Sequence, residues 1–112
     1  MSATTILNDF VRIGNKGTQI ILTMTEVVAG VETAVDLSAG VSTVQIETRK
    51  PRGTITTLTA SILNLPGTDG KIHHIDSTGI FDRRGRWQTR GIINYSNGNL
   101  FKGSWAGFQV GQ

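Results

Sequence analysis

The chain has 112 residues, 38% of them hydrophobic, and a formal net charge of +3. This length supports one domain with a single core, and no apolar run approaches the roughly 18 to 20 residues that span a bilayer. Because the sequence has no cysteine, disulfides, thiolate metal sites and cysteine nucleophiles are excluded. The first residues lack a basic segment followed by an apolar one, so no secretory signal is expected.

Alternating hydrophobic residues predict β-strands throughout the chain, and no stretch favours the 3.6-residue period of a helix. The expected strands cover residues 10–13, 18–25, 34–37, 41–49, 54–63, 71–76, 86–95 and 100–110. A loop is expected at 29–32, and the strongest turn signals are Lys50-Pro51-Arg52-Gly53 and Asn97-Gly98. Roughly seven strands at this spacing predict an all-β, immunoglobulin-like antiparallel sandwich over residues 17–112, preceded by an N-terminal arm or edge strand over residues 1–16.

The alternation also separates buried from exposed positions. The expected core residues are Ile20, Leu22, Val44, Ile46, Trp87 and Ile93. Ile6 and Phe10 make the N-terminal arm apolar enough to add a strand to the sheet edge of a neighbouring subunit. We expect one tryptophan in the core and the other partly buried at an edge or interface. The alternative is that Trp87 and Trp105 form a platform for a ligand.

Seven of the eleven basic residues fall in two clusters. The clusters are Arg49, Lys50 and Arg52, and Arg83, Arg84, Arg86 and Arg90. Two interpretations are open: a contact patch for an acidic protein surface or nucleic acid, or solvated turns and strand ends. Because no aromatic ladder accompanies the arginines, nucleic-acid binding is not expected. The candidate protein-interface residues of the clusters are Arg49, Lys50, Arg52, Arg83, Arg84 and Arg86.

No motif indicates catalysis, a metal or a cofactor. His73 and His74 are adjacent, so on a strand they point to opposite faces and cannot chelate one metal together. His74 and Asp76 share a face, but one histidine and one carboxylate are too few ligands. The sequence has no nucleophile elbow and no glycine-rich phosphate loop that opens a helix. We therefore expect a protein that is not an enzyme and has no catalytic, metal or cofactor residues.

Several segments, in this order, carry a resemblance to a known family. They are residues 13–20 (IGNKGTQI), 35–40 (VDLSAG), 50–54 (KPRGT), 69–71 (DGK), 81–87 (FDRRGRW) and the Asn97-Gly98 hairpin. Together they resemble the immunoglobulin-like domain of tailed-phage virion proteins, of which the N-terminal domain of baseplate upper proteins is an example. This family usually carries Asp where Arg52 stands.

The resemblance implies a non-enzymatic virion structural protein that assembles in several copies on the tail, baseplate or neck. Its partners would be other virion proteins and further copies of itself, in a particle assembled in the host cytoplasm, without membrane or nucleic-acid contact. One alternative places the chain on the capsid as a decoration protein. Another, from a different class, is a carbohydrate- or host-surface-binding module that uses exposed tryptophans.

Overall fold

The computed structural model describes residues 2–7, 11–12, 18–76 and 80–111, and side chains within 19–75 and 80–111. Its strands are β1 (Ser2–Leu7), β2 (Val11–Arg12), β3 (Thr18–Val28), β4 (Val31–Ala34), β5 (Val41–Arg49), β6 (Ile55–Ile62), β7 (Lys71–Asp76), β8 (Gly85–Tyr95), β9 (Leu100–Lys102) and β10 (Ala106–Gly111). The described residues form no helix, so none of them belongs to a helix that could cross a membrane. The all-β prediction is confirmed.

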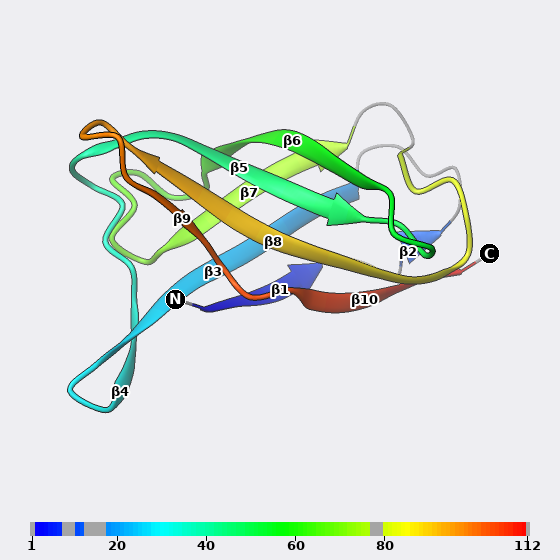
Figure 1. The fold of residues 1–112 in the computed structure, drawn as a ribbon, viewed down its shortest axis with the longest axis horizontal. Helices are drawn as coiled ribbons and strands as arrows, with labels where there is room; N and C mark the ends of the chain where they lie inside the picture. The colour runs from blue at the N-terminus through cyan, green and yellow to red at the C-terminus, as the bar shows by residue number, and fades with distance from the viewer. Residues whose placement is uncertain (1, 8–10, 13–17, 77–79, 112) are drawn as a thin grey trace.

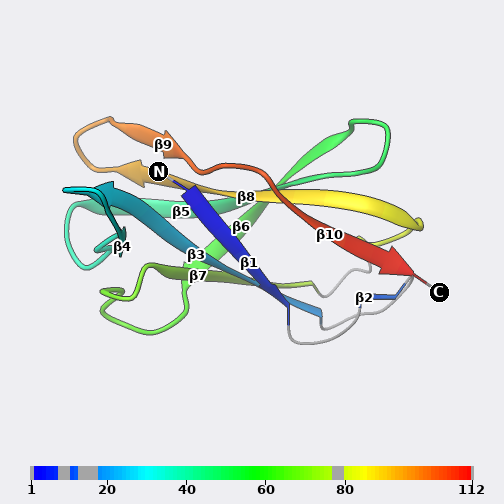
Figure 2. The same ribbon diagram turned by 90° about the horizontal axis from the view of Figure 1, so that it is seen from below.

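The strands form one curled, hydrogen-bonded sheet (Figure 1). Its order is β1-β3-β7-β6-β5-β8-β10-β2, with β4 paired to β3 and β9 to β8. The pairings are antiparallel except for the short parallel contact of β10 with β2. β6 pairs with β5 up to Ala60 and with β7 at Ser61 and Ile62, so it passes from one layer of the sandwich to the other. Figure 2 shows β1 alongside β10, where the curl nearly closes.

The core lies between the two layers and is centred on aromatic rings. The six residues that the alternation places inside, Ile20, Leu22, Val44, Ile46, Trp87 and Ile93, are all buried. Phe81 packs edge-on against Trp87, with ring centroids 5.1 Å apart, and against Phe108 at 5.6 Å. Edge-to-face pairs at this spacing add stability beyond the area that they bury. One end of the core is therefore closed by Phe81, which lies outside the strands.

Of the two forms expected for the N-terminal segment, an arm or an edge strand, residues 2–7 adopt the edge strand. Residues 2–7 form β1, which pairs with β3 from Ser2 opposite Thr25 to Leu7 opposite Ile20. The expected strand at 10–13 is reduced to β2, and Phe10 lies outside the described residues. Because β7 occupies only one side of β3, the other edge is open to main-chain hydrogen bonds, which do not depend on side-chain hydrophobicity. The pairing of Ile6 opposite Ile21 is thus made within the chain.

A second difference lies at the expected loop over 29–32. β3 continues past its expected end at residue 25 to Val28, and the chain turns at Ala29 and Gly30, whose φ values are 52° and 80°. β4 then begins at Val31, inside the expected loop. Positive φ at both central residues is the type I′ geometry of two-residue hairpins. The expected strand at 34–37 is replaced by β4, and Val35 and Leu37 are buried beyond its end.

Candidate functional site

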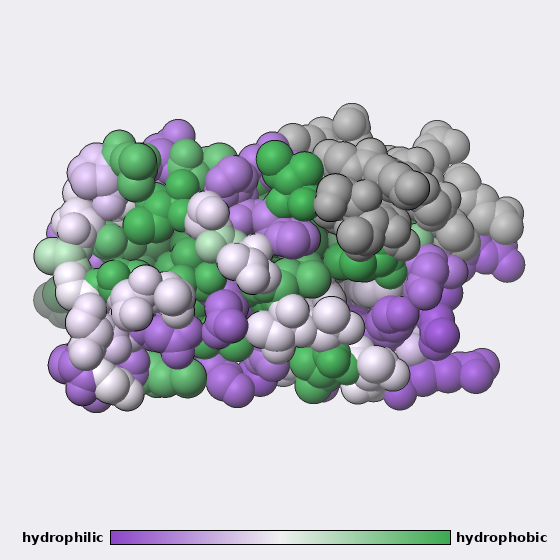
Figure 3. Space-filling view, turned by 90° about the horizontal axis from the view of Figure 1, so that it is seen from above, coloured by the Kyte–Doolittle hydropathy of each residue, from purple (hydrophilic) through white to green (hydrophobic). Residues whose placement is uncertain are grey.

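The two basic clusters of the sequence meet at one end of the sandwich, at the right in Figure 1. The β5–β6 turn carries Lys50 and Arg52, and the connection into β8 carries Arg83 and Arg84. Nζ of Lys50 lies 3.1 Å from Oδ2 of Asp82, so an ion pair joins the two segments. We call Lys50, Arg52, Arg83 and Arg84 the basic end. Hydrophilic side chains gather at the same end in Figure 3.

Packing against the core holds the two segments of the basic end together. Gly85 lies so close to Pro51 that a Cβ added there would come within 2.9 Å of the proline Cγ. Nε1 of Trp87 donates a hydrogen bond of 3.0 Å to the carbonyl oxygen of Arg83. Nζ of Lys50 lies 5.8 Å from the centre of the Trp87 ring. Turn and connection are both fixed on buried residues, while the three arginine side chains are exposed.

Arg52 has a strained backbone at the apex of the β5–β6 turn. The N–H of Gly53 donates to the carbonyl of Lys50 at 2.9 Å, which closes a four-residue turn with Pro51 second and Arg52 third. The φ of Arg52 is 80°, as at the third position of a type II turn, where glycine or asparagine is preferred. A side chain there costs about 1–2 kcal/mol. Strain at an exposed position motivates a functional hypothesis for that residue.

The basic end remains positive at neutral pH. The hydrogen bond from Lys50 holds the pKa of Asp82 below its ordinary value, so this carboxylate is ionised and offsets one cation. Among the residues that the structure describes, no carboxylate forms an ion pair with Arg52, Arg83 or Arg84. Three arginines are therefore available to an external anionic surface.

Arg49 and Arg90 are used differently, because both stack on Trp105. Their guanidinium carbons lie 4.4 and 4.3 Å from the centre of the half-buried indole ring. Nε of Arg90 donates to Oε1 of Glu47 at 2.7 Å, and Nε of Arg49 donates to Oε1 of Gln88 at 2.8 Å. Both cations are committed to partners in the same chain, and the ring that they cover is no open platform.

Arg86 also lies outside the basic end. Its guanidinium covers Gly107 of β10, where an added Cβ would come within 2.5 Å of a guanidinium nitrogen. Of the six cations expected at an interface, the structure thus brings four together. It leaves Arg49 and Arg86 on the outer face of β5, β8 and β10.

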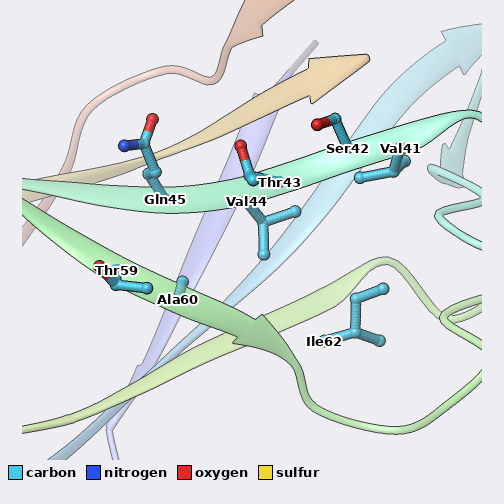
Figure 4. Close-up of a pocket in the computed structure, with 8 residues that line it drawn as sticks. All are labelled: Val41, Ser42, Thr43, Val44, Gln45, Thr59, Ala60 and Ile62. Atoms are coloured by element: carbon cyan, nitrogen blue, oxygen red, sulfur yellow. The ribbon is translucent and has the colours of Figure 1, made fainter. Parts of the chain in front are cut away.

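A hollow of about 370 Å³ opens where β6 leaves β5 for β7 (Figure 4). Its lining residues are Val41, Ser42, Thr43, Val44, Gln45, Thr59, Ala60 and Ile62. Val44 points into the gap that Ile62 also borders, whereas Thr43 and Gln45 point to the opposite side of β5 (Figure 4). None of these eight residues carries an ionisable group, so the hollow offers shape but no acid, base or fixed charge.

The two histidines make contacts between strands. Nε2 of Gln19 donates to Nδ1 of His73 at 3.0 Å, and Nδ1 of His74 donates to the carbonyl of Thr59 at 2.7 Å. The side chain of Asp76 lies outside the described residues. Within the part of the chain that the structure describes, no group of three or more His, Asp or Glu side chains is arranged to hold a metal ion.

Sequence reasoning missed one exposed surface, the projecting β3–β4 hairpin. Three of its valines are exposed, and two glutamates stand beside them: Glu26, Val27, Val28, Val31 and Glu32. The available signal was a pair of β-branched runs on either side of a dipeptide that ends in glycine. Alanine in place of the usual asparagine or aspartate made the dipeptide a weak turn signal.

No family model matches the chain, and no curated protein matches it. Among solved structures, CopC from Methylosinus trichosporium OB3b superimposes with a TM-score of 0.51 at 12% sequence identity. The match covers 96% of this chain and 94% of CopC. At this identity the likeness is one of fold alone, and it supports the sandwich architecture.

The phage virion role implied by the sequence motifs is wrong. A solved structure that shares the fold over nearly the whole chain is CopC, which is not a phage protein. The physical reason is that the motifs are mostly turns, such as Asn97-Gly98, which any antiparallel sandwich of this size requires. The order of these turns is therefore explained by the fold and does not identify a family. The capsid alternative fails with it, and the carbohydrate alternative loses its platform because Trp87 is buried and Trp105 is covered.

Proposed function

We propose that the chain is a binding domain rather than an enzyme, and that its basic end docks on an acidic protein surface. The observation that carries this proposal is the convergence of two basic segments, about 30 residues apart, on one anchored platform. An ion pair between Lys50 and Asp82 and the indole bond to Arg83 hold the platform. Fixed cations lose less conformational entropy on binding than cations on a mobile tail would.

The strained turn supports the same function. An asparagine or glycine at position 52 would relieve the backbone, yet this chain places a guanidinium there. Arginine forms bidentate hydrogen bonds with carboxylates, which suits a docking contact with Asp or Glu side chains. The cost of the turn is thus explained if Arg52 contacts a partner.

Binding to fluorescently labelled poly-L-glutamate, measured by anisotropy, tests the proposal. We expect binding at low salt that weakens with added salt, as exposed charge contacts do. The triple variant R52Q/R83Q/R84Q should lose most of this binding. The control K102Q removes an exposed lysine of β9, outside the basic end, and should bind like the wild type.

Two results would contradict the proposal. One is equal loss of binding in the single variants R83Q and K102Q, which each remove one exposed cation, because the contact would then depend on net charge and not on the basic end. The other is binding to a DNA duplex of equal total charge without binding to polyglutamate. That outcome would assign the basic end to nucleic acid instead.

A further inference from the structure

The end of the molecule opposite the basic end carries a projecting acidic hairpin, at the lower left in Figure 1. We call residues 26–33, which extend β3 and β4 beyond the body of the sandwich, the acidic finger. Its exposed valines are Val27, Val28 and Val31, with exposed fractions of 72%, 51% and 63%. Glu26 and Glu32 are exposed beside them. Val28 and Val31 are cross-strand partners and share one face of the hairpin with Glu26, whereas Val27 lies on the other face with Glu32. Exposed apolar side chains beside charged ones are typical of a contact surface.

Two further carboxylates lie near the base of the acidic finger. Asp36 follows β4, and Asp69 lies in the loop before β7, which is hydrogen-bonded to the same region through Gly67 and Leu37. Hydrogen bonds from Ser38 and Asn64 respectively hold the pKa values of these two aspartates below the ordinary value. Both are therefore ionised at neutral pH.

The two ends are complementary in charge. The basic end has four cations less one carboxylate, which leaves +3, and the opposite end has four carboxylates less Lys71, which leaves −3. The basic end also has an apolar neighbour, since Ile55 begins β6 beside the turn and is 47% exposed. Each end thus combines apolar side chains with charge of one sign, and the signs are opposite.

We propose that the acidic surface bound by the basic end belongs to a second copy of this chain, whose acidic finger docks there. This inference rests on the proposed function and names its partner. The two surfaces lie at opposite ends of a molecule whose longest dimension is 41 Å, so one chain cannot join them. The contact is heterologous, and repetition gives an open chain of copies unless a rotation closes it into a ring.

Sedimentation velocity on two complementary variants tests the inference. E26Q/E32Q removes the charge of the acidic finger, and R52Q/R83Q/R84Q removes that of the basic end, while each leaves the other end intact. We expect the wild type to associate at low salt and each variant alone to associate more weakly, by up to about fivefold for each exposed ion pair that is lost. At concentrations where neither variant associates alone, an equimolar mixture of the two should form a heterodimer that does not grow, because only one pair of intact ends remains.

A third variant separates the apolar contribution. V28T/V31T keeps the β-branched shape and the charges of the acidic finger but removes exposed apolar groups, and it should also weaken association. Circular dichroism and the unfolding midpoint of each variant show whether the fold is kept. K102Q is the matched control and should associate like the wild type.

Two results would overturn the inference. Wild-type protein that remains monomeric at millimolar concentration and low salt excludes the head-to-tail contact. Association that persists unchanged in both charge variants, or a mixture that forms no heterodimer, assigns self-association to another surface. In each case the polyglutamate experiment still decides separately whether the basic end binds an acidic polypeptide.

Discussion

Replacing Arg52 by glycine should make the domain more stable and its basic end weaker in binding. The φ of 80° costs an arginine about 1–2 kcal/mol that glycine avoids. Glycine also lowers the free energy of unfolding by about 0.4–1 kcal/mol, because it raises the conformational entropy of the unfolded chain. From the middle of each range, the net gain is about 0.8 kcal/mol, or roughly 2–5 °C in the midpoint of thermal unfolding for a domain of this size. The charge lost at the apex weakens binding to labelled polyglutamate at the same time.

Two controls separate strain from charge. R52A removes the guanidinium but keeps a side chain at positive φ, so it should weaken binding as R52G does and leave stability near the wild-type value. A29G relieves a second non-glycine residue at positive φ, with φ of 52°, so it should raise the midpoint and leave polyglutamate binding unchanged. Equal midpoints for R52G and R52A would refute the strain argument. Unchanged binding in both would refute a docking role for Arg52.

Three further changes probe the anchoring of this end and the core. W87F keeps a ring but leaves the carbonyl of Arg83 without its donor, so equilibrium unfolding in urea should show a loss of about 1–3 kcal/mol. G91A places a Cβ within 2.4 Å of Sδ of the buried Met24 and should lower the free energy of unfolding by about 1–3 kcal/mol. The double variant G91A/M24A should lose less than the sum of the two single losses, and full additivity would contradict the clash. The pKa of Asp82 is lower in the folded chain than its ordinary 3.8, so the stability that this carboxylate contributes is present above pH 3.8 and is lost as the pH falls through its lowered pKa. D82N should therefore make the unfolding midpoint fall less steeply at acid pH. The effect should be small because the Asp82 carboxylate is exposed.

The sequence predicts best where one face of a strand is buried. Residues 71–76 form β7 with the expected bounds, and β5 covers the expected 41–49, because burial of one face fixes both the period and the register. The turn at Lys50 and Gly53 was also predictable, since proline and glycine act locally. Local signals could not show that the backbone of Arg52 is strained, because its φ is set by the two strands that the turn joins.

The missed parts depend on contacts between distant segments. The apolar residues of the N-terminal segment favour a strand, but only the register with the open edge of β3 shows that β1 pairs within its own chain. The acidic finger is an exception, since it is a local hairpin that was missed because Ala29-Gly30 is a weak turn signal. The meeting of the basic segments requires β5 and β8 to pair in the observed register, which places the turn after β5 beside the connection before β8. Composition alone could only count these cations.

Because β6 crosses between the layers, both layers belong to one sheet, and the short pairing of β6 with β7 is a weak junction in it. Only two residue pairs, at Ser61 and Ile62, join β6 to β7, whereas six join β6 to β5. Regions held by few backbone hydrogen bonds open first in native-state fluctuations. We therefore expect the backbone hydrogen bonds between β6 and β7 to open before those between β5 and β8. The hollow beside Val44 and Ile62 lies at this junction, so its volume should change most when the two layers separate.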